Sequence, residues 1–195
     1  MNLPNRLTLM RIILILPTVI LLMLADAVGW WMWLAAGLSF GAAAITDAFD
    51  GSIARKRGLV TDFGKLMDPV ADKLLVTSVF TCFVALGLCS PWVLIAILAR
   101  EFLITSIRMV SASSGRVIAA NIWGKVKTVT QMTAIVIVMC CGLALSALSR
   151  YGIESGVATS ALDIIRSVAL WLAALATVIS GAVYVYQNRE LFRDA

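Results

Sequence analysis

Long segments without a single charged residue restrict this chain's fold more than any other feature. Residues 27–46, 74–99, 128–149 and 167–188 contain no Asp, Glu, Lys or Arg. Three of these segments are close to the ~20 residues that cross a bilayer as a helix. The whole chain is 61% hydrophobic and only 14% charged, whereas about a quarter of the residues of a soluble domain are charged. We therefore expect lipid to cover most of the surface.

Six membrane helices follow from this segmentation. Residues 74–99 are too long for one span, and Gly87, Ser90 and Pro91 divide them into two helices joined by a tight turn. Residues 7–25 supply the first apolar run, which we expect to be retained although residues 25–27 resemble a signal-peptide cleavage site. Open sheets cannot satisfy their backbone hydrogen bonds in lipid, so the prediction is one all-α integral membrane domain over residues 1–195.

Basic residues gather on one side of the predicted helices. The richer side carries Arg6, Arg11, Lys56, Arg57, Lys65, Arg116, Arg189 and Arg193, whereas the other carries Arg150 and Arg166. The positive-inside rule places the richer side and both termini in the cytoplasm. A net charge of +5 suits contact with anionic lipid headgroups. It does not require nucleic acid, because no basic patch is interleaved with aromatic residues outside the spans.

Two composition features narrow the chemistry. The chain contains no His, which excludes a Ser-His-Asp triad and His-dependent headgroup transfer of the phospholipase D type. Cys82, Cys89, Cys140 and Cys141 lie in apolar runs without metal-ligand spacing. We expect these four cysteines to be small core residues.

Four aspartates form the main candidate site. Asp47 and Asp50 are three residues apart at the end of one apolar segment, and Asp68 and Asp72 are four apart before the next. Each pair therefore shares one helix face. Four carboxylates this close repel one another in a medium of low dielectric, and divalent cations such as Mg²⁺ or Mn²⁺ relieve that repulsion. Solvated helix ends are the alternative, but they leave four aligned carboxylates unexplained in a chain poor in charge.

Small residues accompany the aspartates. Gly51 and Ala54 lie on the first segment, and Gly64 comes one turn before Asp68. Glycine costs a helix ~1 kcal/mol relative to alanine, so it often marks the close approach of another group. A base or a ribose fits such a surface, and so does a neighbouring helix. The sequence alone leaves both interpretations open.

The motif Asp47-x2-Asp50-Gly51-x2-Ala54-Arg55-x8-Gly64-x3-Asp68-x3-Asp72 is similar, position for position, to the signature of the CDP-alcohol phosphotransferase family. The resemblance implies a six-helix membrane enzyme, usually a homodimer, with two divalent cations near the cytoplasmic surface. It also implies that all four aspartates are metal ligands and that Asp72 is the catalytic base. The predicted site for the CDP-linked lipid comprises Asn5, Thr8, Asp50, Gly51, Ala54, Arg55, Gly64 and Lys73.

The reaction implied by this resemblance fits these residue types. A hydroxyl group attacks the phosphorus that bears diacylglycerol and expels CMP. Two metal ions ~4 Å apart can neutralise the diphosphate and stabilise the leaving phosphate. A carboxylate within hydrogen-bond reach can take the proton of the attacking hydroxyl.

The acceptor must be identified from charges elsewhere in the chain. Arg100 and Glu101 lie inside the predicted fourth helix, and charged residues at membrane depth are functional candidates. An acceptor that carries a phosphate needs cations, because a buried dianion must be paired. Snorkelling to the interface is the alternative for Lys125 and Lys127. The predicted acceptor-phosphate site comprises Arg100, Arg108, Lys125, Lys127 and Gln131.

Further patches resemble the bacterial phosphatidylglycerophosphate synthases of that family. They are Asn2-Leu3-Pro4-Asn5-x-Leu7-Thr8-x2-Arg11, Asp68-Pro69-Val70-Ala71-Asp72-Lys73, Ala99-Arg100-Glu101 and Gly124-Lys125-x-Lys127-Thr128-x2-Gln131. The last apolar segment adds little to this resemblance. The resemblance implies CDP-diacylglycerol as donor, sn-glycerol 3-phosphate as acceptor, and a place in the bacterial cytoplasmic membrane. A cardiolipin synthase of the same family, an inositol-phosphate enzyme and an ion or proton transporter are the alternatives.

Overall fold

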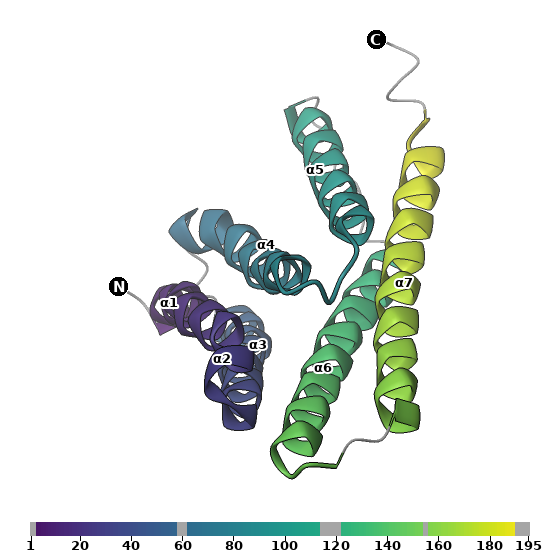
Figure 1. The fold of residues 1–195 in the computed structure, drawn as a ribbon. Coiled ribbons are helices and arrows are strands. Elements are labelled where there is room, and N and C mark those ends of the chain that lie inside the picture. Colours follow the sequence, from purple (N-terminus) through teal and green to yellow (C-terminus); the bar gives the residue numbers. More distant parts are fainter. Residues whose placement is uncertain (1–2, 58–61, 114–121, 154–155, 190–195) are drawn as a thin grey trace.

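The computed structural model describes residues 3–57, 62–113, 122–153 and 156–189 (Figure 1). Side chains at 3–7, 47–57, 62–66, 68–69 and 112–113 lie outside this description. The regular elements of the described chain are all α-helices, which confirms the all-α prediction. They are α1 (Leu3–Met23), α2 (Ala25–Val28), α3 (Trp30–Arg57), α4 (Asp62–Ala85), α5 (Pro91–Ser113), α6 (Ile122–Arg150) and α7 (Gly156–Gln187).

The turn predicted within residues 74–99 is present. Helix α4 ends at Ala85, and Gly87 follows with φ +70°, a left-handed conformation that glycine adopts without strain. Its N–H donates to the carbonyl of Val84 at 3.0 Å, which closes the turn. Pro91 then opens α5, where its missing N–H costs nothing.

Helices α3 and α4 extend further than the apolar pattern predicts. We expected Asp47 and Asp50 at the end of a helix, but α3 continues through them to Arg57. Residues such as Ala, Arg and Lys propagate a helix well, and no proline interrupts this stretch. Helix α4 likewise begins at Asp62, so Asp68 is already in its second turn. The aspartates are therefore set on regular helical backbone.

The helices form two groups that meet in the middle of the molecule (Figure 1). Helix α1 packs against α3 and α4, whereas α6 and α7 form a closely packed pair. Helix α6 also packs against α3, and α5 packs against α7. Gly142 of α6 sits on the ring of Trp33 of α3, because an added Cβ there would lie 2.7 Å from the ring carbons.

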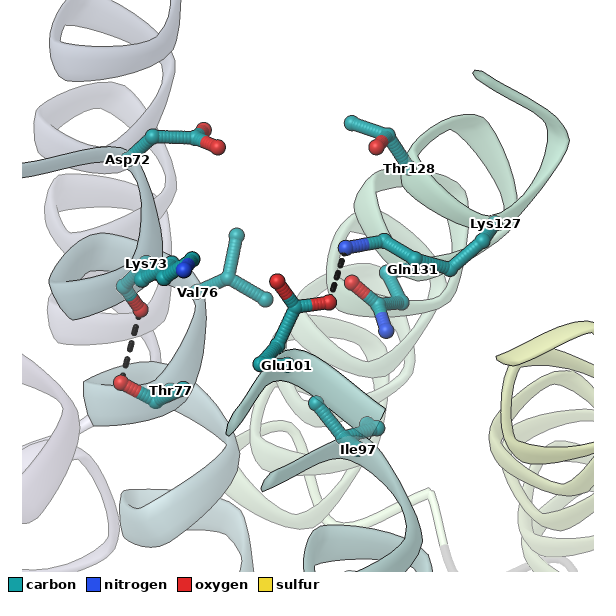
Figure 2. A pocket seen from close by; sticks show the side chains of 9 residues that line it. All are labelled: Asp72, Lys73, Val76, Thr77, Ile97, Glu101, Lys127, Thr128 and Gln131. Carbon is teal, nitrogen blue, oxygen red and sulfur yellow. Dashed lines mark hydrogen bonds and ion pairs between the residues drawn. The ribbon is translucent and has the colours of Figure 1, made fainter. Parts of the chain in front are cut away.

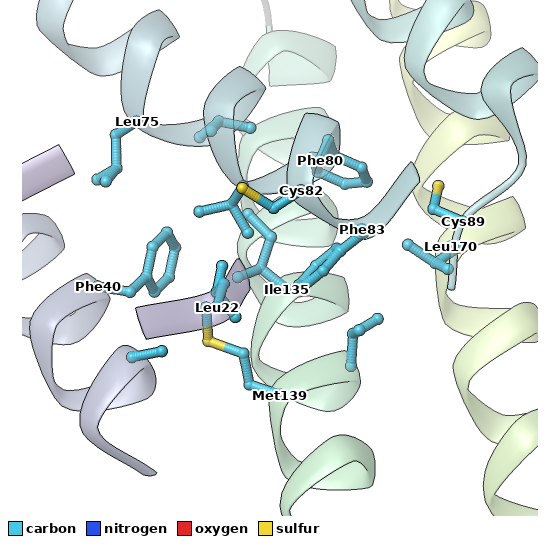
Figure 3. Close-up of a cluster of buried hydrophobic side chains, with 14 of the residues drawn as sticks. Leu22, Phe40, Leu75, Phe80, Cys82, Phe83, Cys89, Ile135, Met139 and Leu170 are labelled. Carbon is cyan, nitrogen blue, oxygen red and sulfur yellow. The ribbon is translucent and has the colours of Figure 1, made fainter. Parts of the chain in front are cut away.

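One apolar core joins these helices (Figure 3). Phe40 of α3, Phe80 and Phe83 of α4, and Ile135 of α6 are almost fully buried in it. The two α4 rings meet edge to face with their centroids 6.2 Å apart. Large apolar side chains also cover the outside, such as Trp92, which is 71% exposed. Within the described residues, α6 and α7 are long and apolar enough to cross a membrane.

The cysteine prediction is right at three positions and wrong at one. Cys82, Cys89 and Cys141 are buried, whereas Cys140 is exposed on α6. Successive positions on a helix point about 100° apart, so with Val138, Met139 and Cys141 buried, Cys140 points to the opposite, outward face of α6.

Candidate active site

The motif aspartates occupy consecutive helices, with Asp47 and Asp50 on α3 and Asp68 and Asp72 on α4. Because both stretches are helical, each pair shares one face. Asp72 has a described side chain, which is exposed and lines a cleft. The side chains of Asn5, Asp47, Asp50, Gly51, Ala54, Arg55, Gly64 and Asp68 lie outside the described part. How these side chains are placed relative to Asp72 therefore stays a prediction.

A narrow polar cleft lies between α4, α5 and α6 (Figure 2). Its free volume is about 10 Å³, close to the smallest space that holds one water molecule. A substrate must therefore move side chains aside to enter. The lining residues are Asp72, Lys73, Val76 and Thr77 of α4, Ile97 and Glu101 of α5, and Lys127, Thr128 and Gln131 of α6.

An ion-pair network forms one wall of the cleft. The Oε1 atom of Glu101 accepts hydrogen bonds from Nζ of Lys127 and, at 3.0 Å, from Nη1 of Arg100. The exposed fractions of these three side chains are only 10–12%. Buried charges are tolerated when they are paired in this way. Glu101 therefore holds in place two of the cations that the sequence assigned to the acceptor phosphate.

Helix α7 supplies the outer partners of this network. Nη2 of Arg100 donates to Oγ of Ser180 at 2.9 Å. Nε2 of Gln131 donates to Oγ1 of Thr177 at 2.9 Å. Both α7 hydroxyls are buried, and their spacing of three residues puts them on one helix face. Gln131 and Arg100 are thus oriented from outside the cleft.

Arg108 is held by the same face of α7, one turn further along. Its Nε donates to the hydroxyl of Tyr184 at 3.3 Å, and its guanidinium carbon lies 5.7 Å from the centre of that ring. Arg108 is itself exposed and does not line the cleft. Lys125 is likewise exposed and outside the lining. It is two positions from Lys127 on α6, so the two side chains point to nearly opposite sides of the helix.

Of the residues predicted to bind the CDP-linked lipid, some line the cleft and others do not. Lys73 lines the cleft beside Asp72, and its Nζ donates to Oγ1 of Thr105 on α5. Thr8 is buried on α1, away from the cleft lining. The structure therefore brings together Asp72, Lys73, Lys127 and Gln131, places Arg100 directly behind them, and leaves Lys125 and Arg108 outside.

Sequence reasoning missed several residues that shape this site. Glu101 was noted as a charge at membrane depth but was not assigned to the site. The α7 partners Thr177, Ser180 and Tyr184 could have been found from polar side chains recurring every three or four residues on an apolar helix. Arg11 was used for the topology and for the N-terminal resemblance but was not assigned to the site, and it is buried in α1.

Comparison with known proteins gives matches along nearly the whole chain. A family model described as CDP-alcohol phosphatidyltransferase matches residues 1–180. The CDP-diacylglycerol–glycerol-3-phosphate 3-phosphatidyltransferase of Bacillus subtilis is 38% identical over 205 residues, which cover 100% of this chain and 98% of the relative. A protein of the same name from Rickettsia felis is 38% identical and covers 98% of this chain and 97% of its own. A probable phosphatidylglycerophosphate synthase of Mycobacterium tuberculosis is 35% identical and covers 94% and 80%.

Proposed function

Because this chain belongs to the CDP-alcohol phosphatidyltransferase family, we propose that it transfers the phosphatidyl group of CDP-diacylglycerol to sn-glycerol 3-phosphate. The products are phosphatidylglycerophosphate and CMP. The observation that carries this proposal is the cleft in which the Asp72 carboxylate shares a small polar space with Lys73 and Lys127. Such a space suits a substrate that has a hydroxyl group at one end and a phosphate at the other.

Asp72 is the proposed base. Its exposed carboxylate accepts the proton of the acceptor's C1 hydroxyl as that oxygen attacks the phosphorus bearing diacylglycerol. The bond between this phosphorus and the oxygen of the CMP phosphate breaks, and CMP leaves with the electron pair. Lys73, on the next residue of α4, supplies a positive charge beside the developing negative charge.

The oxygen ligands of the motif suit hard divalent cations. The motif offers four carboxylates and no sulfur or imidazole ligand, which is the chemistry that Mg²⁺ and Mn²⁺ prefer. Asp47, Asp50, Asp68 and Asp72 would hold two such ions, which would neutralise the diphosphate and stabilise the leaving phosphate. Among the described side chains no cluster of three or more ligands occurs. The side chains of Asp47, Asp50 and Asp68 lie outside that part.

Lys127 and Gln131 are the proposed contacts of the acceptor phosphate, with Arg100 supporting them from behind. A lysine ammonium has three donors, so Lys127 can bind phosphate oxygens and still face Glu101. Lys125 and Arg108 are exposed, and we assign them to attracting the dianionic acceptor towards the cleft.

The enzyme's setting is the bacterial cytoplasmic membrane, with α1 and α3–α7 as six spanning helices and the cleft on the cytoplasmic side. The apolar exterior and the basic residues near the cleft support this arrangement. Both termini are then cytoplasmic, and the enzyme is a homodimer. Labelling of a single cysteine at position 57 from outside the cell would contradict this topology.

An assay with a panel of acceptors tests the proposal. Purified enzyme receives CDP-diacylglycerol with glycerol 3-phosphate, phosphatidylglycerol or inositol phosphate, while CMP release and the lipid product are followed together. We expect turnover with glycerol 3-phosphate that a chelator abolishes and that Mg²⁺ or Mn²⁺ restores. Turnover with phosphatidylglycerol alone would make the protein a cardiolipin synthase of the same family.

A further inference from the structure

One oxygen of the Glu101 carboxylate has no partner in the described part of the chain. Lys127 and Arg100 both donate to Oε1, and no hydrogen bond reaches Oε2 from any described residue. Figure 2 shows Oε1 turned towards Lys127 and the other oxygen turned into the space between α4 and α6. This oxygen is not one of the buried atoms that lack a partner, so it is open to the cleft and free to accept a hydrogen bond from a ligand there.

The position of this carboxylate does not depend on Lys127 alone. Arg100 is anchored at its other end by Ser180, with 2.9 Å between Nη2 and Oγ. Its stem is packed closely against α7, because an added Cβ at Gly181 would lie 3.2 Å from Cγ of Arg100. If Lys127 swings towards a bound phosphate, Arg100 still holds Oε1. The second oxygen therefore keeps its direction into the cleft.

The order of charges across the cleft matches the order of groups in the acceptor. Asp72 and Lys127 lie on opposite walls, and Glu101 lies between them (Figure 2). This step rests on the proposed function, in which the C1 hydroxyl is at Asp72 and the phosphate is at Lys127. The C2 hydroxyl of glycerol 3-phosphate then lies next to Glu101.

We infer that Oε2 of Glu101 accepts a hydrogen bond from the hydroxyl on the carbon next to the attacking one. Glu101 thereby selects acceptors that carry two adjacent hydroxyl groups and a phosphate. A carboxylate that served only to neutralise Lys127 and Arg100 would not distinguish acceptors by that hydroxyl. The two roles can therefore be separated by changing the acceptor.

The test compares glycerol 3-phosphate with 3-hydroxypropyl phosphate, which keeps the attacking hydroxyl and the phosphate but lacks the C2 hydroxyl. In the unmodified enzyme we expect kcat/KM to favour glycerol 3-phosphate by about 10- to 100-fold, as for a hydrogen bond to a charged group. In Glu101→Gln the amide oxygen must face the two cations. The amide NH₂ group then faces the C2 hydroxyl, and it cannot accept a hydrogen bond from that hydroxyl. The preference should fall at least about fivefold.

Two further variants keep the result decisive. Lys125→Met removes an exposed charge outside the cleft lining, so it should lower kcat/KM for both acceptors by the same factor and leave the preference unchanged. Should Glu101→Gln not fold, Glu101→Asp keeps the charge and withdraws the carboxylate by one methylene group, with the same expected loss of preference.

A Glu101→Gln enzyme that is slower but keeps the full preference for glycerol 3-phosphate would overturn the inference and leave the proposed function standing. An unmodified enzyme that does not use glycerol 3-phosphate at all would overturn both. That second failure is visible before any variant is made, so the two are distinguishable.

Discussion

Two regions of the molecule carry their functional groups in different ways. On α3 and α4 the groups are aspartates on two consecutive helices, and their spacing of three or four residues is enough to put each pair on one face. On α5, α6 and α7 the groups depend on partners far away in the chain. Lys127 pairs with Glu101 across 26 residues, and Arg100 pairs with Ser180 across 80.

We therefore expect the aspartates to serve the reaction itself and the paired charges to serve the binding of the acceptor. In the proposed mechanism the aspartates hold the divalent cations and supply the base, so a change there should remove the reaction itself. On the paired side, Lys127 and Arg100 are each hydrogen-bonded to a residue of another helix. A change there should weaken the binding of the acceptor while the donor is bound as before.

The largest effect is expected from Asp72→Asn on the aspartate side. Loss of the proposed base should lower kcat by at least about 100-fold, since general-base catalysis contributes about 10²- to 10⁴-fold. CMP release from CDP-diacylglycerol measures it. Asp163→Asn is the matched control, because that side chain is 53% exposed and forms an ion pair with Arg166 on α7, away from the cleft lining. A fully active Asp72→Asn enzyme would disprove the proposed mechanism.

Lys127→Met comes next and tests the paired side. Removing one partner of a buried charge pair costs about 2–5 kcal/mol, so the KM for glycerol 3-phosphate should rise by about 30-fold or more. The KM for CDP-diacylglycerol should change little. Lys125→Met is the control for charge, since Lys125 is exposed and outside the cleft lining. Equal effects of the two variants would mean that the cleft does not bind the acceptor phosphate.

The junction between the two sides should be sensitive to bulk. Gly142→Ala places a methyl group 2.7 Å from the Trp33 ring, and such overpacking costs about 1–3 kcal/mol. Thermal unfolding in detergent should show the loss of stability. Gly41→Ala is the control, because its added Cβ would meet nothing within 4 Å. If both variants unfold at the same temperature, α3 and α6 are not in close contact at Trp33.

The smallest effect is expected from Ser180→Ala, which removes the outer anchor of Arg100. One hydrogen bond to a charged group that keeps its other partner is lost, so the KM for glycerol 3-phosphate should rise about fivefold. Steady-state kinetics with saturating CDP-diacylglycerol measures it. Ser160→Ala makes the same chemical change at an exposed position of α7 and should have no effect. If the KM for CDP-diacylglycerol changes instead, Arg100 contributes to the binding of CDP-diacylglycerol and not of glycerol 3-phosphate.

Local signals in the sequence predicted most of the helices. The turn at Gly87 and Pro91 was found because both residues restrict the backbone in ways that do not depend on the rest of the fold. Helix ends were less predictable, since α3 runs to Arg57 through residues that lie outside the apolar pattern. Among the acceptor residues, Lys125 and Lys127 were equivalent in sequence, and only the packing of α6 distinguished them.

The sequence by itself determined the all-helical architecture and the family, because uncharged segments and a motif with fixed spacing act through the local geometry of a helix. It also determined that each pair of aspartates shares a helix face. Only the tertiary structure decided which cation faces the cleft, that Glu101 holds it, and that α7 orients Arg100 and Gln131. Hydrogen bonds between distant helices depend on how those helices are packed, and no local pattern of residues records that packing.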